Sequence, residues 1–320
     1  MRTSPTPGPN PRISAEPMCP RPPVTITVLG VPFIGYKITA DVAECYSTST
    51  LLRPTRLPHT TMKRNSHNIR GFFTTLKRTY GLWKTFGFAY ACPLCGWHAR
   101  YFYPAGFDFP VLSRYQVISA GRRKNVRCPR CNSSARERLI YLFLKRRTGA
   151  FSNPLDILHI APEKNLQHTL KRRSRGTHIS GDIEPGAADT TFDIQKIPFA
   201  NERFDLVICS HVLEHIIDDA RAMHELYRVL RSGGIAILQV PYSPLLTKTF
   251  EDPRVQRPGE RERVFGQSDH VRIYGTDYPD RLRKAGFIVE MIFPNAFLSE
   301  KEIKKYALDP QEPIFFCLSA

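Results

Sequence analysis

Two short cysteine pairs are the residues whose type and spacing most clearly indicate chemistry. Cys92-Pro-Leu-Cys95 and Cys128-Pro-Arg-Cys131 each place two thiols three positions apart, in what reads as a tight turn. Two such turns can direct four thiolates at one ion, and a tetrahedral set of four sulfurs suits Zn2+. Because four thiolates leave no open coordination position, such an ion would be structural. The alternative is two redox dithiols or unrelated free thiols.

The distance between the pairs indicates additional structure. The 32 residues between Cys95 and Cys128 exceed the usual spacing of about 15–20, so an inserted loop or extra strands must lie there. The pairs resemble zinc-ribbon knuckles, with Gly96 following the first, which favours Zn2+ over an iron–sulfur cluster. The remaining four cysteines read as a tail thiol, a loop thiol and two buried apolar residues: Cys19, Cys45, Cys209 and Cys317.

In the second half of the chain, apolar strand-like runs alternate with amphipathic segments, and these elements must position any site there. Runs that are apolar on both faces are typical of parallel strands buried between helix layers. The pattern predicts a helix over 134–147, ended by Gly149, and another over 218–231, capped by Asp218 and ended by Gly233. The six strand-like runs are 156–161, 177–182, 204–210, 235–240, 287–292 and 314–319.

The segment from Asp193 to Pro241 resembles the central part of a class I S-adenosylmethionine-dependent methyltransferase. Its HVLEH motif, amphipathic helix, LRSGG turn and following strand carry the likeness, which extends over residues 155–320. The order of paired cysteine turns, helix and ILHIAPE is similar to that of a zinc-ribbon-containing subfamily. The resemblance implies an α/β fold with a doubly wound, mostly parallel, Rossmann-like seven-stranded sheet whose last strand is antiparallel. A small four-cysteine zinc-ribbon-like domain would precede it, with S-adenosylmethionine and structural Zn2+ as cofactors.

Several residues after the predicted strands are candidate contacts for the cofactor, because ligands of doubly wound sheets bind outside the carboxyl ends of the strands. Asp182 ends the second run at a spacing that suits hydrogen bonds from ribose hydroxyls, although it would also serve as a turn residue. The resemblance implies that Asp193 contacts the adenine amino group and that Ile194 flanks the base. A helix or turn cap is the alternative for Asp193. By the same resemblance, Ser210 and His211 would lie beside the reacting methyl group.

The first strand departs from the family pattern of a Gly-rich loop with an acidic residue. The chain reads HIAPEKN there, with His159 at the acidic position and no glycine. Only the small Ala161 leaves room for close approach of the backbone to a ligand. Glu163 could receive the cofactor's ammonium group, or be an ordinary carboxylate at a helix start. These three residues are the expected contacts at the methionine end.

Three histidines are further candidates. His211 and His215 stand four apart, which on a helix would place them on one face, as in a metal pair. No carboxylate or third histidine is arranged with them in the sequence, so a role in the loop and helix start is favoured over metal binding. His270, beside Asp269, could orient or deprotonate an acceptor, and the alternative is an ordinary surface loop. His211 and His270 are therefore the candidate catalytic residues.

Basic residues concentrate in the first half, where residues 1–150 hold 24 Lys and Arg against 5 Asp and Glu. Such a stretch attracts polyanions, nucleic acid included, unless it is simply a solvated basic surface or tail. We expect a disordered or weakly structured Pro-rich basic extension over 1–65, a zinc-ribbon-like region over 66–134 and the methyltransferase domain over 135–320. No apolar run is long enough to span a membrane and no secretory pattern opens the chain, which predicts a cytoplasmic protein.

The expected function is methyl transfer from S-adenosylmethionine to an acceptor that the sequence leaves open: a small molecule, a sugar or glycan, or RNA. Methyl transfer from a sulfonium chiefly requires alignment, so the absence of an obvious catalytic triad is no objection. The alternative is a zinc-ribbon binding module fused to a degenerate, non-catalytic methyltransferase fold. An NAD(P)-dependent oxidoreductase is disfavoured because no GxGxxG motif follows the first strand.

Overall fold

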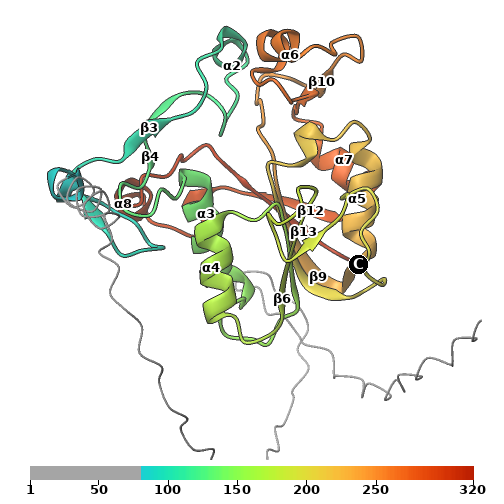
Figure 1. Cartoon of the computed structure of the whole chain (residues 1–320), viewed down its shortest axis with the longest axis horizontal. Helices are drawn as coiled ribbons and strands as arrows, with labels where there is room; N and C mark the ends of the chain where they lie inside the picture. The colour runs from blue at the N-terminus through green and yellow to red at the C-terminus, as the bar shows by residue number, and fades with distance from the viewer. Residues whose placement is uncertain (1–80) are drawn as a thin grey trace, which may run out of the picture.

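A computed structural model of the protein describes residues 81–320 (Figure 1). The expected Pro-rich basic extension over 1–65, with its strand-like run over 24–36, lies outside the described residues, as do Cys19 and Cys45.

A seven-stranded sheet forms the centre of the molecule, with the order β12-β13-β9-β8-β5-β6-β7. Strand β13 is antiparallel to both of its neighbours, and the other six strands all run in one direction. This confirms the expected doubly wound, mostly parallel sheet, whose order reverses between β5 and β8. The strands are β5 (Ile157–Ile160), β6 (His178–Asp182), β7 (Thr190–Thr191), β8 (Phe204–Ser210), β9 (Leu230–Gln239), β12 (Ile288–Ile292) and β13 (Ile314–Leu318).

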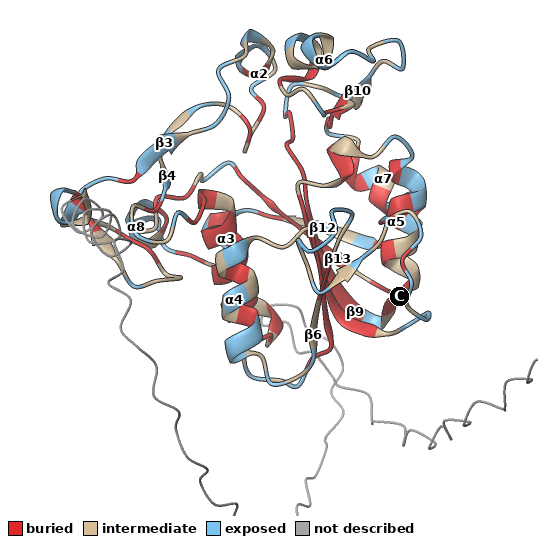
Figure 2. Cartoon of the chain, viewed as in Figure 1, coloured by how far each residue is buried: buried red, intermediate tan, exposed pale blue. Residues whose placement is uncertain are grey.

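Helices cover both faces of the sheet (Figure 1). One face carries α3 (Ala135–Phe143) with the π-helical turn η1 (Leu144–Thr148), α4 (Lys164–Arg173) and α8 (Glu300–Lys305), and the other carries α5 (Asp219–Arg228) and α7 (Tyr278–Lys284). Each face has its own apolar core (Figure 2), in which Leu139 and Leu166 are buried on the first side and Met223 and Leu282 on the second. None of the helices within 81–320 is long and apolar enough to span a bilayer.

The helix ends follow the local signals of the sequence, with one exception. Ser134 and Glu137 form a reciprocal capping box at the start of α3, and Gly149 follows η1 with a φ of 68°. Asp218 caps α5, but this helix ends at Arg228 instead of continuing to residue 231. The residues 230–233 belong to β9, because pairing with β8 and β13 takes the backbone away from the helix.

The cysteine region consists of two small antiparallel hairpins, β1–β2 and β3–β4. The extra strands expected between the cysteine pairs are β2, β3 and β4, joined by one short helix. The bounds are β1 (Phe86–Ala91), β2 (His98–Ala99), β3 (Tyr103–Ala105), α2 (Pro110–Arg114) and β4 (Arg123–Arg127).

A second insertion, between β9 and α7, meets the segment that carries α2. Figure 1 shows α2 and α6 side by side above the sheet, and Leu112 and Phe265 are buried together at their contact. Gly266 has a φ of +85°, and a Cβ there would lie 2.4 Å from the Leu112 side chain. The shorter elements here and in the loops are β10 (Phe250–Glu251), α6 (Pro258–Phe265), β11 (Arg272–Ile273), η2 (Leu213–His215) and η3 (Pro294–Ala296).

Candidate active site and metal centre

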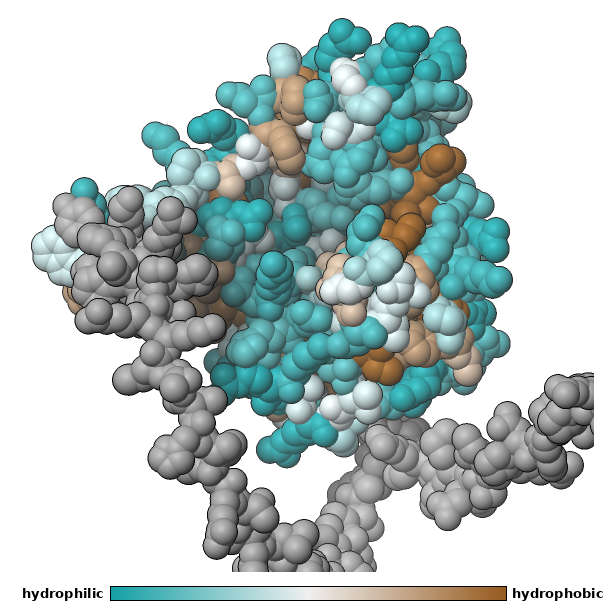
Figure 3. Space-filling view, in the orientation of Figure 1, coloured by the Kyte–Doolittle hydropathy of each residue, from teal (hydrophilic) through white to brown (hydrophobic). Residues whose placement is uncertain are grey.

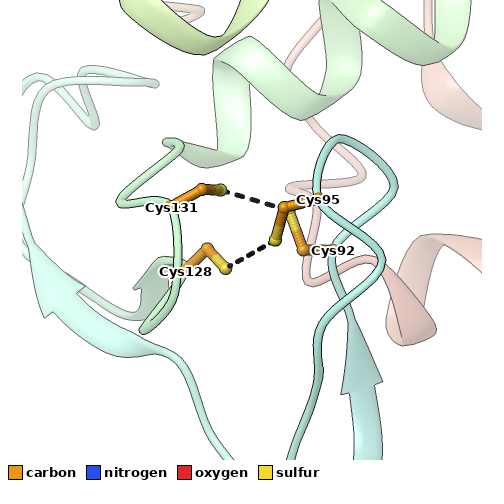
Figure 4. A group of neighbouring side chains, drawn as sticks. All are labelled: Cys92, Cys95, Cys128 and Cys131. Atoms are coloured by element: carbon orange, nitrogen blue, oxygen red, sulfur yellow. Dashed lines mark hydrogen bonds between the residues drawn. The ribbon is translucent and has the colours of Figure 1, made fainter. Parts of the chain in front are cut away.

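Four cysteine sulfurs converge where the two knuckle turns meet (Figure 4). The Sγ of Cys92 lies 3.6 Å from that of Cys131, and the Sγ of Cys95 lies 3.7 Å from that of Cys128. A tetrahedral Zn2+ with Zn–S bonds of about 2.3 Å holds its sulfurs about 3.8 Å apart. The spacing of these thiols therefore fits the zinc centre expected from the sequence.

The two turns that present the thiols share one hydrogen-bond pattern. The backbone N–H of Gly96 donates to the carbonyl of Cys92 (2.9 Å), and that of Asn132 donates to the carbonyl of Cys128 (2.8 Å). Gly96 and Asn132 both have left-handed φ angles, +71° and +61°. Asn is among the few non-glycine residues that adopt this conformation readily, so it replaces the glycine in the second knuckle.

Arg138 of α3 connects the cysteine region to the C-terminal part of the sheet domain. Its side chain is fully buried, and burial lowers its pKa to about 10, a tendency that ionised cysteines nearby oppose. The guanidinium donates to four backbone carbonyls, those of Val126, Ser133, Tyr306 and Ala307. The cysteine region is thus fixed to the segment that follows α8.

A narrow pocket of about 70 Å³ lies at the carboxyl ends of β5 and β6, beside the point where the strand order reverses. Its lining is mostly apolar, with two carboxylates at the edge, and includes Ala161, Asp182, Phe192, Asp193, Ile194 and Val212. Four of these six were singled out from the sequence as cofactor contacts. The fold brings them together from three separate segments.

Ala161 makes the turn for which other first loops of this type use glycine. It follows β5 with a φ of +44°, and its N–H donates to the carbonyl of Gly181 at 2.8 Å. The left-handed region costs an L-residue about 1–2 kcal/mol, and alanine adds only one methyl group to the pocket wall. The chain therefore keeps a glycine-like path at this loop without a glycine.

The two acidic residues of the narrow pocket also organise turns. The Oδ1 of Asp182 accepts from the backbone N–H of Glu184 at 2.9 Å. The carboxylate of Asp193 accepts from the backbone N–H of Gln195 at 2.8 Å and from its side-chain amide at 3.1 Å. Both residues thus combine the turn role with a place on the pocket wall.

A larger cavity of about 500 Å³ lies between the carboxyl ends of the strands and the β3–β4 hairpin. The space-filling view shows a recess in this mostly hydrophilic face, between the segment carrying α2 and the body of the molecule (Figure 3). Both predicted catalytic histidines line the cavity, and three arginines make its wall basic. Its charged and titratable lining includes Arg123, Arg127, Arg136, His211, Glu214 and His270.

One loop, 211–216, takes part in both hollows. Val212 and Ile216 line the narrow pocket, whereas His211, Glu214 and His215 line the large cavity. The loop follows β8, and His211 has a left-handed φ of +57° while its N–H donates to the carbonyl of Gln239. His211 and His215 do not share a helix face, because the chain forms only the short 3-10 turn η2 here, in line with the favoured role of a loop and helix start.

Glu163 and Arg136 meet near the end of β5. The Oε1 of Glu163 lies 3.6 Å from the Nε of Arg136, and neither atom has a hydrogen-bond partner among the described residues. Burial opposes ionisation of Glu163, but the hydrogen bond from His159 at 3.1 Å and the charges of His159 and Arg136 together outweigh burial and lower the pKa of Glu163 to about 2. His159 itself is fully buried in β5 and lines neither the narrow pocket nor the larger cavity. Its side chain contacts Glu163 and the ring of His178.

Glu214 is enclosed beside His211. Its side chain is 1% exposed, and its Oε1 lies 3.2 Å from the Nδ1 of His211. Burial raises the pKa of Glu214 to about 8 and lowers the pKa of His211 well below its usual value. Near neutral pH the imidazole of His211 is therefore uncharged and able to accept a proton.

His215 and His270 lie together on the wall of the large cavity. Their ring centroids are 4.7 Å apart with an edge-to-face angle of 84°, and the Nδ1 of His215 lies 3.1 Å from Asp269. His270 is buried, and burial lowers its pKa to about 4, so the alternative of an ordinary surface loop is wrong for this residue.

Two residues at the site were missed from the sequence. Arg136 lies within the capping box of α3, between Ser134 and Glu137, and Glu214 is the carboxylate of the HVLEH motif itself. The motif offered a signal for Glu214, whereas nothing near Arg136 marked it among many basic residues. Ser210, predicted beside the reacting methyl, has a buried hydroxyl with no hydrogen-bond partner among residues 81–320 and lines neither hollow.

Comparisons with known proteins concern the sheet domain. Residues 151–238, which run from before β5 to the end of β9, match the family model described as "Methyltransferase domain". A stretch of 74 residues is 34% identical to 2-methyl-6-phytyl-1,4-hydroquinone methyltransferase 2 of Oryza sativa subsp. japonica, covering 22% of this chain and 21% of that protein. Another stretch, of 102 residues, is 30% identical to an uncharacterized 37.1 kDa transposon protein of Streptomyces fradiae, and it covers 32% of this chain and 29% of that protein.

Among solved structures, a methyltransferase from Archaeoglobus fulgidus described as SAM dependent aligns with a TM-score of 0.39 at 14% identity, covering 58% of this chain and 95% of that one. The chain spans less than a third of the length of either curated relative.

Proposed function

We propose that this chain, which carries a methyltransferase domain over residues 151–238, transfers a methyl group from S-adenosylmethionine to a small-molecule acceptor in the large cavity. The observation that carries the proposal is the loop 211–216, which lines the narrow pocket with Val212 and Ile216 and the large cavity with His211 and Glu214. A nucleoside seated on one side of this loop and an acceptor on the other would meet at its N-terminal end. A cavity of about 500 Å³ has the size of a site for a small molecule.

The donor set of the narrow pocket supports an adenosine ligand. Asp182 stands at the end of β6, where an acidic side chain can accept hydrogen bonds from ribose hydroxyls. Ile194 and Phe192 offer apolar surfaces for a planar base, with Asp193 at the edge. The pocket is narrower than a nucleoside requires, so its loops must open when the ligand enters.

The pair Arg136 and Glu163 suits the methionine end. One cationic and one anionic group, each with an unpartnered buried atom, complement the carboxylate and ammonium of an amino acid. We therefore assign Glu163 to the ammonium and Arg136 to the carboxylate. His159 acts as a positioning residue, since it holds Glu163 from within the sheet.

Bound S-adenosylmethionine supplies a sulfonium-linked methyl group, which is electrophilic. The protein's task is to hold an acceptor in line with that methyl group and to take up its proton where the acceptor is weakly nucleophilic. His211 is uncharged near neutral pH, and its Nε2 has no hydrogen-bond partner among the described residues. His211 is therefore the proposed proton acceptor.

The test combines binding and turnover on the full chain. Titration calorimetry with S-adenosylmethionine should show binding, and Asp182→Ala should weaken it by more than 10-fold because the ribose loses its acceptor. Glu184→Gln is the matched control, since it changes a nearby exposed acid that does not line the pocket. Labelled-methyl transfer is then measured against a small-molecule extract, total RNA and a protein extract.

Labelling of the small-molecule fraction supports the proposed acceptor class. Labelling of RNA or protein alone would contradict it, and unchanged affinity in Asp182→Ala would overturn the cofactor site.

A second candidate function follows from the narrowness of the adenosine pocket and its glycine-free first loop. In this alternative the sheet domain is non-catalytic and the cysteine region is a binding module. Absence of calorimetric binding by zinc-replete protein would favour it.

A further inference from the structure

Three side chains from two distant segments converge on the wall of the large cavity. One ligand atom each from Glu214, His215 and His270 lies within 4.8 Å of the others. Donors bound to one ion at about 2.1 Å are at most about 4.2 Å apart, so small side-chain rotations suffice to bring all three onto a shared ion. The set is separate from the four cysteines, which lie in the N-terminal hairpins.

Each histidine ring has a defined neighbour. The Nδ1 of His215 lies 3.1 Å from a carboxylate oxygen of Asp269, and the ring of His270 packs edge-to-face against the ring of His215. Histidines that bind metals usually donate their second N–H to a carboxylate or a carbonyl, which fixes the ring and orients the free nitrogen. The contact of His215 with the carboxylate of Asp269 is of this kind.

Glu214 provides the independent observation. Its side chain is 1% exposed and lines the cavity, yet neither carboxylate oxygen accepts a hydrogen bond among the described residues. A buried carboxyl group without partners is costly, and a cation at the shared centre would satisfy it. The neighbouring His211 reaches only an ion-pair distance of 3.2 Å, without hydrogen-bond geometry.

The two segments are fixed to each other by their backbones. The N–H of Val271 donates to the carbonyl of Glu214 at 2.9 Å, and the buried guanidinium of Arg272 donates to the carbonyls of Leu213 and Ile217. The donors therefore stand on a supported scaffold, as a preformed site requires.

We propose that Glu214, His215 and His270 bind a divalent transition-metal ion whose open positions face the large cavity. Two imidazoles and one carboxylate suit Zn2+, Mn2+, Fe2+ or Co2+, and such three-ligand sites leave room for water or substrate. Ion binding needs only these side chains. The further step, that an oxygen of the methyl acceptor binds the ion, rests on the proposed function.

The test counts metal ions in the full chain with Co2+ as the probe. After equilibrium dialysis, elemental analysis should find two equivalents in the wild type, one at the cysteines and one at the new site. Glu214→Gln and His270→Ala should each retain one equivalent, with the intense thiolate–Co2+ absorption of the cysteine site unchanged. Asp269→Asn should lower the affinity for the second Co2+ ion by roughly 10-fold, because His215 loses the carboxylate that orients its ring while all three ligands remain.

His224→Ala is the matched control, since it removes an exposed histidine of α5 and should retain both equivalents. Far-UV circular dichroism of each variant shows that the fold is kept. The proposal would be overturned if the wild type bound only one equivalent of Co2+. It would also be overturned if the second equivalent remained in both Glu214→Gln and His270→Ala, since that ion would then be an adventitious ion only.

These outcomes remain distinguishable from failure of the proposed function. A second equivalent in a protein that shows no calorimetric binding of S-adenosylmethionine would leave the metal site in place and remove the methyl-transfer proposal.

Discussion

At the scale of single residues, two non-glycine positions at the ends of neighbouring parallel strands stand out. Ala161 after β5 and His211 after β8 have left-handed φ angles of +44° and +57°. Such conformations persist where the surrounding structure enforces them, and they cluster at functional sites. Here they turn the chain at the two strand ends between which the sheet order reverses, where ligands of doubly wound folds bind.

The strain at Ala161 predicts opposite effects for two substitutions. Ala161→Gly should raise the free energy of unfolding by up to about 1 kcal/mol and leave binding of S-adenosylmethionine intact, because glycine adopts this φ freely. Ala161→Val should lower stability and abolish binding, since a branched side chain is strained here and fills the narrow pocket. Denaturant unfolding and titration calorimetry measure both effects. Equal behaviour of the two variants would contradict the role of this turn.

Asp156, directly before β5, predicts a defined pH dependence of stability. Burial opposes its ionisation, but hydrogen bonds from Arg231 and Arg203 (3.0 and 2.7 Å) outweigh burial and hold its pKa below the usual value. A lowered carboxyl pKa stabilises the fold above the unfolded pKa of about 3.9, and this stabilisation disappears as the pH falls through the folded pKa.

Asp156→Asn should therefore lower the free energy of unfolding by about 1–3 kcal/mol at pH 7. The difference from the wild type should shrink as the pH falls below about 4, as measured by urea unfolding across the pH range. Asp280→Asn, which removes a carboxylate from an exposed surface ion pair, is the control and should show little effect at either end. A difference that grows with acid would contradict the assignment.

At the scale of elements, the loop 211–216 depends on β11 for its position. The guanidinium of Arg272 is 4% exposed, pairs with Glu251 at 2.8 Å, and donates to carbonyls on either side of η2. The loop has little regular structure of its own, so its backbone carbonyls depend on the buried Arg272 side chain as a hydrogen-bond donor. The insertion between β9 and α7 therefore covers the cavity and also holds the loop 211–216 in position.

Arg272→Met should destabilise the protein by about 3–5 kcal/mol, because it leaves several buried carbonyls of this loop without their donor. Hydrogen exchange of the amides over 211–217 should accelerate more than that of the β5 and β8 amides. Arg254→Met, at an exposed ion pair with Asp252, is the control and should change neither measurement. Uniform acceleration across the sheet would show that Arg272 supports the fold at large instead of this loop.

At the scale of the whole molecule, the cysteine region reaches the site through its insertion. The hairpin β3–β4 and the segment after α2 supply one wall of the large cavity, while Arg138 and Leu112 join this region to the rest of the chain. The narrow pocket, by contrast, is lined only by residues of the sheet domain. Metal at the cysteines should therefore matter for the acceptor more than for the methyl donor.

Cys95→Ser should open the cysteine region while the sheet stays folded. We expect limited proteolysis to cut within 86–131, methyl transfer to be lost, and calorimetric binding of S-adenosylmethionine to persist, because an ion held by the four cysteines would stabilise the cavity wall alone. Cys317→Ala, a buried thiol of β13, is the contrasting variant: it should lower overall stability without new cleavage in 86–131. Loss of donor binding in Cys95→Ser would contradict this division of roles.

Much of the fold follows from local sequence patterns. The six apolar runs became β5, β6, β8, β9, β12 and β13, α3 begins after Ser134, and Asp218 caps α5 as predicted. Two thiols three positions apart, repeated once, also determined the cysteine cluster, because a tight turn needs no distant contact to present them. Local patterns could not predict the short edge strand β7 or the early end of α5, because strand pairing within the sheet decides both.

The residues of the site also fall into two groups, those that the sequence could place and those that only the tertiary structure brings together. Ala161 and Asp182 could be placed from the sequence, because each lies at the end of a strand that reaches the same edge of a parallel sheet, whereas Asp193 came from the family resemblance. The meeting of Glu214 with His270, and of Arg136 with Glu163, was decided only by the tertiary structure. The physical reason is that Glu214 meets His270 only after the insertion between β9 and α7 folds over the strand ends, and Arg136 meets Glu163 only after α3 packs near the end of β5. No periodicity along the chain records either approach.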